Sequence, residues 1–161
     1  MKYVIAIVVL MFTAVTFADV QRYPLPNNST FPISQAVEVK AGTTIVYHSG
    51  TVPGPANPDA IRFSDEFWGD TKTQALSVLG RIEDSLKDKG LGMGDVIKMT
   101  VFLVGVPDNG GRMDFTGFME AYTQYFGTEA QPNLPARSAV QVADLAAPGM
   151  LVEIEVIVAR P

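Results

Sequence analysis

The chain has 161 residues, no cysteine and a single histidine, and its 12 basic and 17 acidic residues give a formal net charge of −5. The lack of cysteine excludes disulfides, thiolate nucleophiles and thiolate metal sites, and a single histidine excludes a multi-histidine metal centre. The acidic balance argues against nucleic acid as a partner, because phosphate binding requires clustered lysine and arginine.

Residues 1–18 have the pattern of a secretory signal peptide. Lys2 gives a positive start, residues 3–15 form an apolar run, and small residues precede a cleavage point after Ala18. The run is shorter than the roughly 20 apolar residues that a membrane-spanning helix requires. We therefore expect cleavage, a periplasmic or secreted protein, and no stable membrane anchor; an uncleaved anchor is the alternative.

The rest of the chain predicts one domain at residues 31–161, preceded by an extended, proline-bearing arm at residues 19–30. Residues 35–39 and 43–49 have the composition of strands, and a Lys-Ala-Gly turn between them predicts a hairpin. Residues 53–69 are rich in proline and glycine and predict a long loop. Such a loop is either functional or a surface excursion that packs its aromatic residues.

Two helices are predicted, each preceded by an aspartate suited to capping. The first follows Asp70 and continues to residue 89. The second follows Asp114 and ends at Gly127, and its aromatic stripe is typical of core rather than of a cofactor site. An apolar strand at residues 96–104 precedes a glycine-rich connection at residues 107–112.

Residues 134–142 and 151–160 predict two C-terminal strands that carry charges among apolar side chains. Because side chains alternate along a strand, Arg137 and Ala139 share a face, as do Glu153 and Glu155. One interpretation is a cross-strand ion pair between Arg137 and one of these glutamates. The other is a site in which Arg137 captures a carboxylate and Glu153 directs water.

The predicted order is two strands, helix, strand, helix and two strands. This order indicates an α+β fold in which two helices pack on one face of a single mixed sheet. The other face combines polar and apolar side chains, so it is too apolar for water and too polar for a core.

Several motifs resemble those of the Rid (YjgF) family of enamine/imine deaminases over residues 31–160. The motifs are Ser34-Gln35-Ala36, Ser49-Gly50, the segment from Gly94 to Leu103, Pro135-Ala136-Arg137-Ser138 and Val152-Glu153-Ile154-Glu155. The resemblance implies a chorismate-mutase-like homotrimer whose sheets pack around a central axis, with three clefts at the subunit boundaries.

The resemblance also implies roles for individual residues. The arginine matching Arg137 holds the substrate carboxylate, and the glutamate matching Glu153 serves the attacking water. The expected binding residues are Arg137, Ser49, Gly50, Ala139, Ile33 and Met119. Ile33 and Met119 stand where the deaminases commonly carry a tyrosine and an asparagine, so this cleft should be more apolar. His48, beside the Ser-Gly motif, is expected to face solvent at a strand end.

The implied activity is hydrolysis of small imino acids to 2-oxo acids and ammonia, as in a 2-iminobutanoate/2-iminopropanoate deaminase, without a metal or organic cofactor. The alternative is a non-catalytic trimer that binds small carboxylates or a protein partner through the same clefts.

Overall fold

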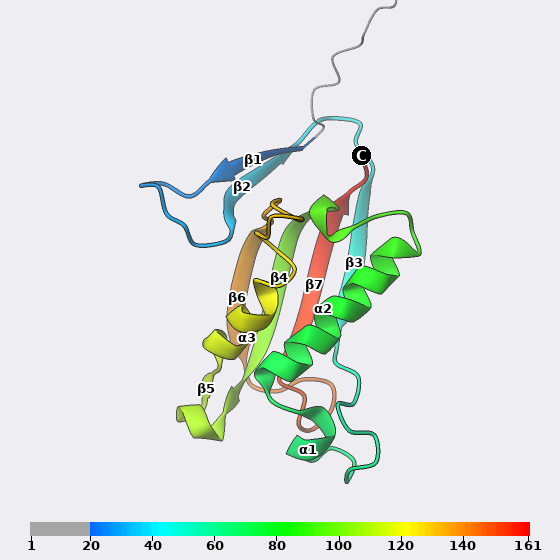
Figure 1. The fold of residues 1–161 in the computed structure, drawn as a ribbon, viewed down its shortest axis with the longest axis vertical. Coiled ribbons are helices and arrows are strands. Elements are labelled where there is room, and N and C mark those ends of the chain that lie inside the picture. The colour runs from blue at the N-terminus through cyan, green and yellow to red at the C-terminus, as the bar shows by residue number, and fades with distance from the viewer. Residues whose placement is uncertain (1–19) are drawn as a thin grey trace, which may run out of the picture.

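The computed structural model describes residues 20–161, so the expected signal peptide lies outside the described residues. This part of the chain forms one sheet with helices packed against it (Figure 1). The strands are β1 (Val20–Pro24), β2 (Ser34–Val39), β3 (Ile45–Thr51), β4 (Val96–Val106), β5 (Arg112–Met113), β6 (Ala136–Val142) and β7 (Val152–Ala159). The helices are α1 (Asp65–Trp68), α2 (Thr71–Lys87) and α3 (Phe115–Tyr122), and the 3₁₀ turns η1 (Met93–Asp95) and η2 (Pro107–Asn109) flank β4.

The sheet has the strand order β1-β2-β6-β4-β7-β3, and β5 pairs with the end of β4. β4 is parallel to β6 on one side and antiparallel to β7 on the other. β2 runs parallel to β6, and β3 runs antiparallel to β7. This mixed single sheet confirms the predicted fold class, and it separates the two C-terminal strands by the width of β4.

The predicted hairpin between β2 and β3 is wrong. β2 pairs with β1 and β6, whereas β3 pairs with β7 at the other edge of the sheet. The chain does turn between them, since the Thr43 N–H donates to the Lys40 carbonyl at 3.3 Å. Turn residues indicate a reversal of the chain, but they do not determine which strand the next one will join.

The N-terminal arm contains a strand that its irregular composition did not predict. β1 pairs antiparallel with β2. The Arg22 guanidinium donates to the carbonyls of Gly94, Val96 and Leu134 over 2.7 to 3.0 Å and fastens the arm to the body of the protein. Strand formation here depends on these distant partners rather than on local propensity.

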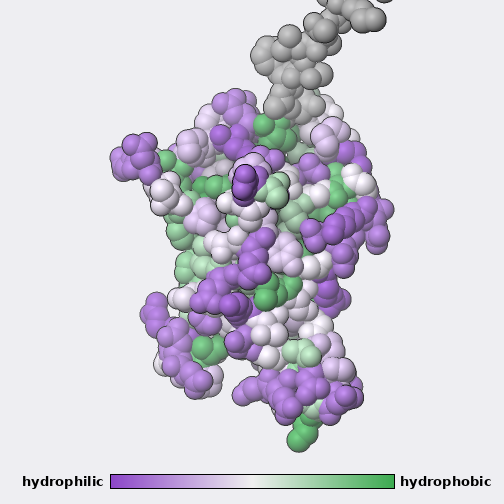
Figure 2. All heavy atoms as spheres, in the orientation of Figure 1, coloured by the Kyte–Doolittle hydropathy of each residue, from purple (hydrophilic) through white to green (hydrophobic). Residues whose placement is uncertain are grey.

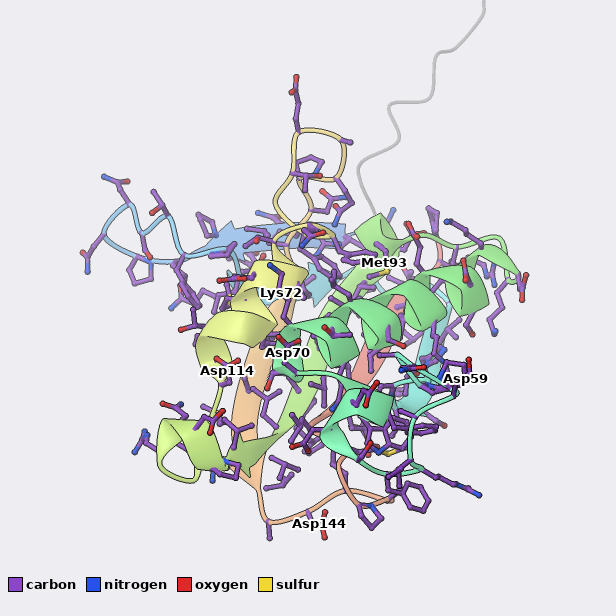
Figure 3. All side chains as sticks on the ribbon, turned by 60° about the horizontal axis from the view of Figure 1, so that its bottom comes forward. Asp59, Asp70, Lys72, Met93, Asp114 and Asp144 are labelled. Atoms are coloured by element: carbon purple, nitrogen blue, oxygen red, sulfur yellow. The ribbon has the colours of Figure 1, made fainter. Side chains whose placement is uncertain are left out.

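Both long helices begin at the predicted aspartates, which Figure 3 labels. A carboxylate oxygen of Asp70 accepts the Thr73 N–H at 2.8 Å, and one of Asp114 accepts the Gly117 N–H at 2.9 Å. The bond from Thr73 holds the pKa of Asp70 below its usual value. Each cap stabilises its helix by about 1 kcal/mol.

α3 is shorter than predicted, because it ends at Tyr122 and not at Gly127. Phe126 nevertheless reaches the core, where its ring stacks on Tyr122 at 4.9 Å between centroids. The spacing of the aromatic residues therefore predicted the buried rings correctly, but it predicted a helix that is too long. A turn after Tyr122 keeps the Phe126 ring buried without helical structure.

α2 and α3 cover one face of the sheet (Figure 1), and their outer surface is mainly hydrophilic (Figure 2). An ion pair of 2.7 Å between Lys72 and Glu120 joins the two helices, and Figure 3 shows Lys72 at the start of α2. The core beneath them includes Ala75, Val78, Leu79, Ile82, Met99, Val101, Leu103, Ile154 and Val156.

The opposite face, here called the open face, carries exposed apolar rings and branched side chains among polar groups. Tyr47 is 77% exposed and Val140 is 44% exposed. A hollow of about 270 Å³ on this face is lined in part by Lys98, Thr100 and Glu155. Within residues 20–161, no helix has the length and hydrophobicity that crossing a membrane requires.

Candidate functional site

Arg137 lies on β6 on the helix-covered face of the sheet. It pairs in register with Met99 of β4, which is fully buried under the helices, so both side chains point the same way. The guanidinium lies among four aromatic rings, which we call the ring cluster. The distances from Cζ to the ring centroids are 4.2 Å for Tyr122, 5.2 Å for Phe118, 5.4 Å for Phe31 and 5.7 Å for Phe115.

The Arg137 charge has no carboxylate partner within ion-pair distance among residues 20–161. Its Nη1 atom is 3.2 Å from the Met119 sulfur, and a thioether is only a weak acceptor. Burial lowers the pKa of Arg137 from its ordinary value. The ring faces compensate part of the lost hydration through cation–π attraction. The Tyr122 hydroxyl partly opposes this pKa shift through a hydrogen bond to the guanidinium. A bidentate carboxylate from a ligand would supply the charged acceptor that is missing.

Tyr122 connects the ring cluster to the segment before β2. Its hydroxyl donates to the Pro32 carbonyl at 2.9 Å, and this bond ties the segment before β2 to α3. Burial raises the pKa of Tyr122 to about 12, so the hydroxyl stays protonated and keeps donating at neutral pH. The bond also places the neighbouring Phe31 ring over Arg137.

Glu153 lies on the open face, on the other side of the sheet. Its neighbours in β7, Val152 and Ile154, are fully buried under the helices, so the intervening side chain points away from them. Gly50 lies directly against its carboxyl group, because a Cβ at this glycine would come within 2.9 Å of the Glu153 Cδ.

A β-bulge lies beside this contact. His48 pairs with Val156 and Thr51 pairs with Ile154, so Ser49 and Gly50 together stand opposite Glu155, which is two positions from Glu153 in β7. A bulge bends its strand and can redirect side chains toward a site. The missing Cβ of Gly50 leaves room for Glu153. Ser49, Gly50 and Glu153 form what we call the bulge cluster.

The predicted site residues therefore lie on opposite faces of the sheet within one chain. Arg137, Ala139 and Met119 belong to the helix-covered face, whereas the bulge cluster belongs to the open face. β4 separates the two C-terminal strands, so the alternative of an Arg137 ion pair with Glu153 or Glu155 across adjacent strands is wrong. The alternation of side chains along each strand correctly predicted which residues share a face, but it does not determine the order of the strands in the sheet.

The structure also shows where His48 and Ile33 lie. His48 was expected to face solvent, but it is half-buried, with ring nitrogens 2.9 Å from the Ser85 hydroxyl and 2.9 Å from the Ser49 carbonyl. It therefore links the bulge to α2. Ile33 is half-buried in the segment between Pro32 and Ser34 that runs beside the start of β6.

Phe31, Phe115 and Tyr122 are residues of the Arg137 environment that sequence reasoning missed. Phe115 and Tyr122 were recognised as part of an aromatic stripe and interpreted as core. Phe31 stands at the boundary of the arm, where no periodic pattern marks it. A signal does exist for Tyr122, because a buried hydroxyl requires a hydrogen-bond partner. Among residues 20–161, no group of three or more histidine, aspartate or glutamate side chains is arranged to hold a metal ion.

A family model described as Endoribonuclease L-PSP matches residues 26–160. A RutC family protein of Pyrococcus horikoshii is 35% identical over 127 residues, which are 78% of this chain and 85% of the relative. TdcF of Escherichia coli, named as a candidate reactive intermediate deaminase, is 34% identical over 129 residues, covering 80% of this chain and 87% of TdcF.

Solved structures agree with these relatives. The crystal structure of E. coli TdcF with bound serine has a TM-score of 0.56 and 33% identity, covering 83% of this chain and 91% of that one. The Rid family protein YyfB of Yersinia pestis has a TM-score of 0.66 at 22% identity, covering 88% and 99%, and shows the same fold. At a coarse level these similarities support a function of the reactive intermediate deaminase type. The chain belongs to the Rid (YjgF) family, as its sequence motifs indicated.

Proposed function

We propose that this protein hydrolyses the enamines and imines of amino acids to 2-oxo acids and ammonia. The observation that carries the proposal is the Arg137 guanidinium, half-buried in the ring cluster with no carboxylate beside it among the described residues. A planar fork in such a place is suited to binding a small carboxylate. The relative TdcF, crystallised with serine, offers an example of an amino acid bound on this fold.

The proposed reaction needs one base near the bound imine. Glu153 accepts a proton from water, the water oxygen bonds to the imine carbon, and the C=N double bond becomes a single bond. The same carboxyl group then returns the proton to nitrogen, which gives a carbinolamine. In the last step Glu153 takes the proton of the new hydroxyl group and passes it to nitrogen, so the C–N bond breaks, the carbonyl forms and ammonia leaves. Arg137 holds the carboxylate and fixes the position of the imine carbon during these steps. Backbone amides near Gly50 and Ala139 help to fix the substrate.

Each complete site requires two copies of the chain. Arg137 and Glu153 point to opposite faces of one sheet and stand on strands separated by β4, so one copy cannot apply both to a small ligand. We propose a homotrimer in which Arg137 of one copy faces the bulge cluster of the next. Closed cyclic symmetry gives three equivalent clefts, and assembly would cover exposed residues of the open face such as Tyr47 and Val140.

We further propose that the protein acts outside the cytoplasm, on the strength of its N-terminal pattern. Imines in that location would come from an amino-acid oxidase or dehydrogenase. RNA cleavage, which the name of the family model mentions, is a poorer fit to this chain, since its net charge of −5 disfavours phosphate binding.

The second candidate is a non-catalytic trimer that binds 2-oxo acids or a partner protein through the same clefts. The contact between Arg137 and Met119 favours it, because a thioether stands where it supplies no strong hydrogen bond to the reacting nitrogen. The two candidates share the carboxylate clamp and differ in whether Glu153 performs chemistry.

The test uses purified protein without residues 1–18 and imines made in situ by an amino-acid oxidase, with semicarbazide trapping the imine that is not hydrolysed. Wild type should speed ammonia release, and Arg137→Ala should lower kcat/KM about tenfold to a hundredfold, the worth of a charge-assisted hydrogen bond. Arg137→Lys should also be poor, because an ammonium cannot replace the fork. The exposed Arg112 provides the matched control Arg112→Ala, which should behave as wild type. Failure of the wild-type protein to accelerate any imine, small or large, would reject the deaminase.

A further inference from the structure

The ring cluster has a floor and a rim. Phe118 and Tyr122 are fully buried and form the floor beneath the Arg137 guanidinium. Phe31 and Phe115 form the rim: Phe31 is 41% exposed and Phe115 is half-buried, and their rings stack at 6.4 Å with planes 21° apart. Only the rim rings are available to a molecule that arrives from solvent.

A carboxylate bound to Arg137 places the rest of its molecule against this rim. The floor rings and β6 close the inner side, so atoms attached beyond the carboxylate must extend outward past Phe31 and Phe115. The remaining neighbour of the guanidinium is the flexible thioether of Met119. These walls are apolar, and they offer no strong hydrogen-bonding group to a polar substituent.

The Phe31 ring is held in place rather than carried on a loose arm. The Tyr122 hydroxyl binds the Pro32 carbonyl at 2.9 Å, and the Ser34 hydroxyl binds the Leu134 carbonyl at 2.6 Å. The Phe31 N–H donates to the Ser29 hydroxyl at 3.3 Å. An aromatic surface that is already ordered costs little entropy when a ligand covers it.

We propose that the Arg137 site selects imino acids with a large apolar or aromatic side chain, and that Phe31 determines this selectivity. The proposal rests on the deaminase function and adds the substrate class. Such a side chain would cover the exposed part of the Phe31 ring, whereas the imine of alanine would leave it in water. One additional methylene in an apolar pocket changes kcat/KM by about tenfold to a hundredfold, so a larger apolar side chain should be clearly preferred.

The experiment measures kcat/KM for the imines of phenylalanine, leucine and alanine, generated by one oxidase of broad specificity. Wild type should prefer the phenylalanine imine over the alanine imine by about tenfold or more. Phe31→Ala should reduce this preference to about threefold or less, because kcat/KM should fall much further for the phenylalanine imine than for the alanine imine. Phe63→Ala is the matched control, because Phe63 is 38% exposed and packs on Trp68 of α1, outside the ring cluster.

Calorimetry with phenylpyruvate and pyruvate gives a readout that does not depend on turnover. Tighter binding of phenylpyruvate that is lost in Phe31→Ala supports the inference, even where no imine is hydrolysed and the deaminase proposal fails. Equal turnover and equal binding of large and small ligands overturns the inference and leaves the deaminase intact. A change of sedimentation in Phe31→Ala without a change of preference also overturns it, since the ring would then belong to the contact between copies.

Discussion

The ring cluster around Arg137 and the bulge cluster around Glu153 are built in contrasting ways. The ring cluster draws on the segment before β2, on α3 and on β6, and its floor is part of the hydrophobic core. The bulge cluster comes from two paired strands, β3 and β7, and lies at the surface of the sheet. The first set is fixed by tertiary packing and the second by a local irregularity in the pairing of strands.

This contrast bears on the proposed division of the site between copies. Arg137 has a built binding environment with no carboxylate in ion-pair distance among residues 20–161, and Glu153 has its carboxylate against Gly50. The two sets lie on opposite faces of one sheet. Contact with another copy is the simplest way to bring an anion site and a base to the same small molecule.

The largest expected effect separates the two clusters by function. Glu153→Gln keeps the size and the hydrogen bonding of the side chain but removes the base, so kcat should fall about a hundredfold. Binding of pyruvate or a longer 2-oxo acid through Arg137 should persist, because the ring cluster is unchanged. The deaminase assay and calorimetry, run on the same preparations, measure the two effects.

A binder without catalysis predicts a different result for the same variant. Removing a negative charge from the cleft would strengthen the attraction of Arg137 for a carboxylate, so affinity should rise and no activity would exist to lose. Glu129→Gln, a change at an exposed loop residue, controls for loss of a carboxylate elsewhere. Unchanged turnover in Glu153→Gln would remove this residue from the mechanism.

A smaller effect tests whether the two clusters meet between copies. Arg137→Ala and Glu153→Gln chains, co-expressed with different tags and purified through both, should form mixed trimers. A cleft with Arg137 from one chain and Glu153 from the other is intact. Every trimer that contains both variants has one intact cleft out of three, so the doubly purified sample should show about a third of the wild-type activity from two inactive variants.

The control for this mixture is Arg137→Ala co-expressed with the double variant, which has no intact cleft and should stay inactive. Sedimentation of each sample shows whether the oligomer has formed. A mixed oligomer of the expected size that recovers no activity would contradict a shared site, and a stable monomer at micromolar concentration would remove the intersubunit cleft.

Sequence reasoning succeeded where the determining physics is local or periodic. The caps at Asp70 and Asp114, the buried aromatic stripe and the mixed sheet with helices on one face follow from hydrogen bonding and alternation. It failed where one element depends on a distant partner. The β2–β3 hairpin and the cross-strand Arg137–Glu153 pair both assumed that neighbours in the chain are neighbours in the sheet. Phe31 could not be placed over Arg137 without the Tyr122–Pro32 bond.

The smallest expected effect concerns Tyr122, which belongs to the ring cluster alone. Burial raises its pKa to about 12 from the ordinary value of 10.0, so the folded protein keeps a proton that the unfolded chain releases at lower pH. The contribution of this group to the free energy of unfolding is therefore complete below pH 10.0 and is lost as pH rises toward about 12.

Tyr122→Phe should lower the free energy of unfolding at neutral pH by about 1 kcal/mol, through loss of the hydrogen bond to Pro32, and should make its decline at alkaline pH shallower. Urea unfolding from neutral pH to about pH 11 measures both effects. Tyr47→Phe, at a ring that is 77% exposed in a single chain, is the control for loss of a phenol hydroxyl outside the ring cluster, and sedimentation of both variants checks that the oligomer is unchanged. Equal alkaline slopes in wild type and Tyr122→Phe would show that the hydroxyl beneath Arg137 is not protected from ionisation, and that the floor of the ring cluster is open to water.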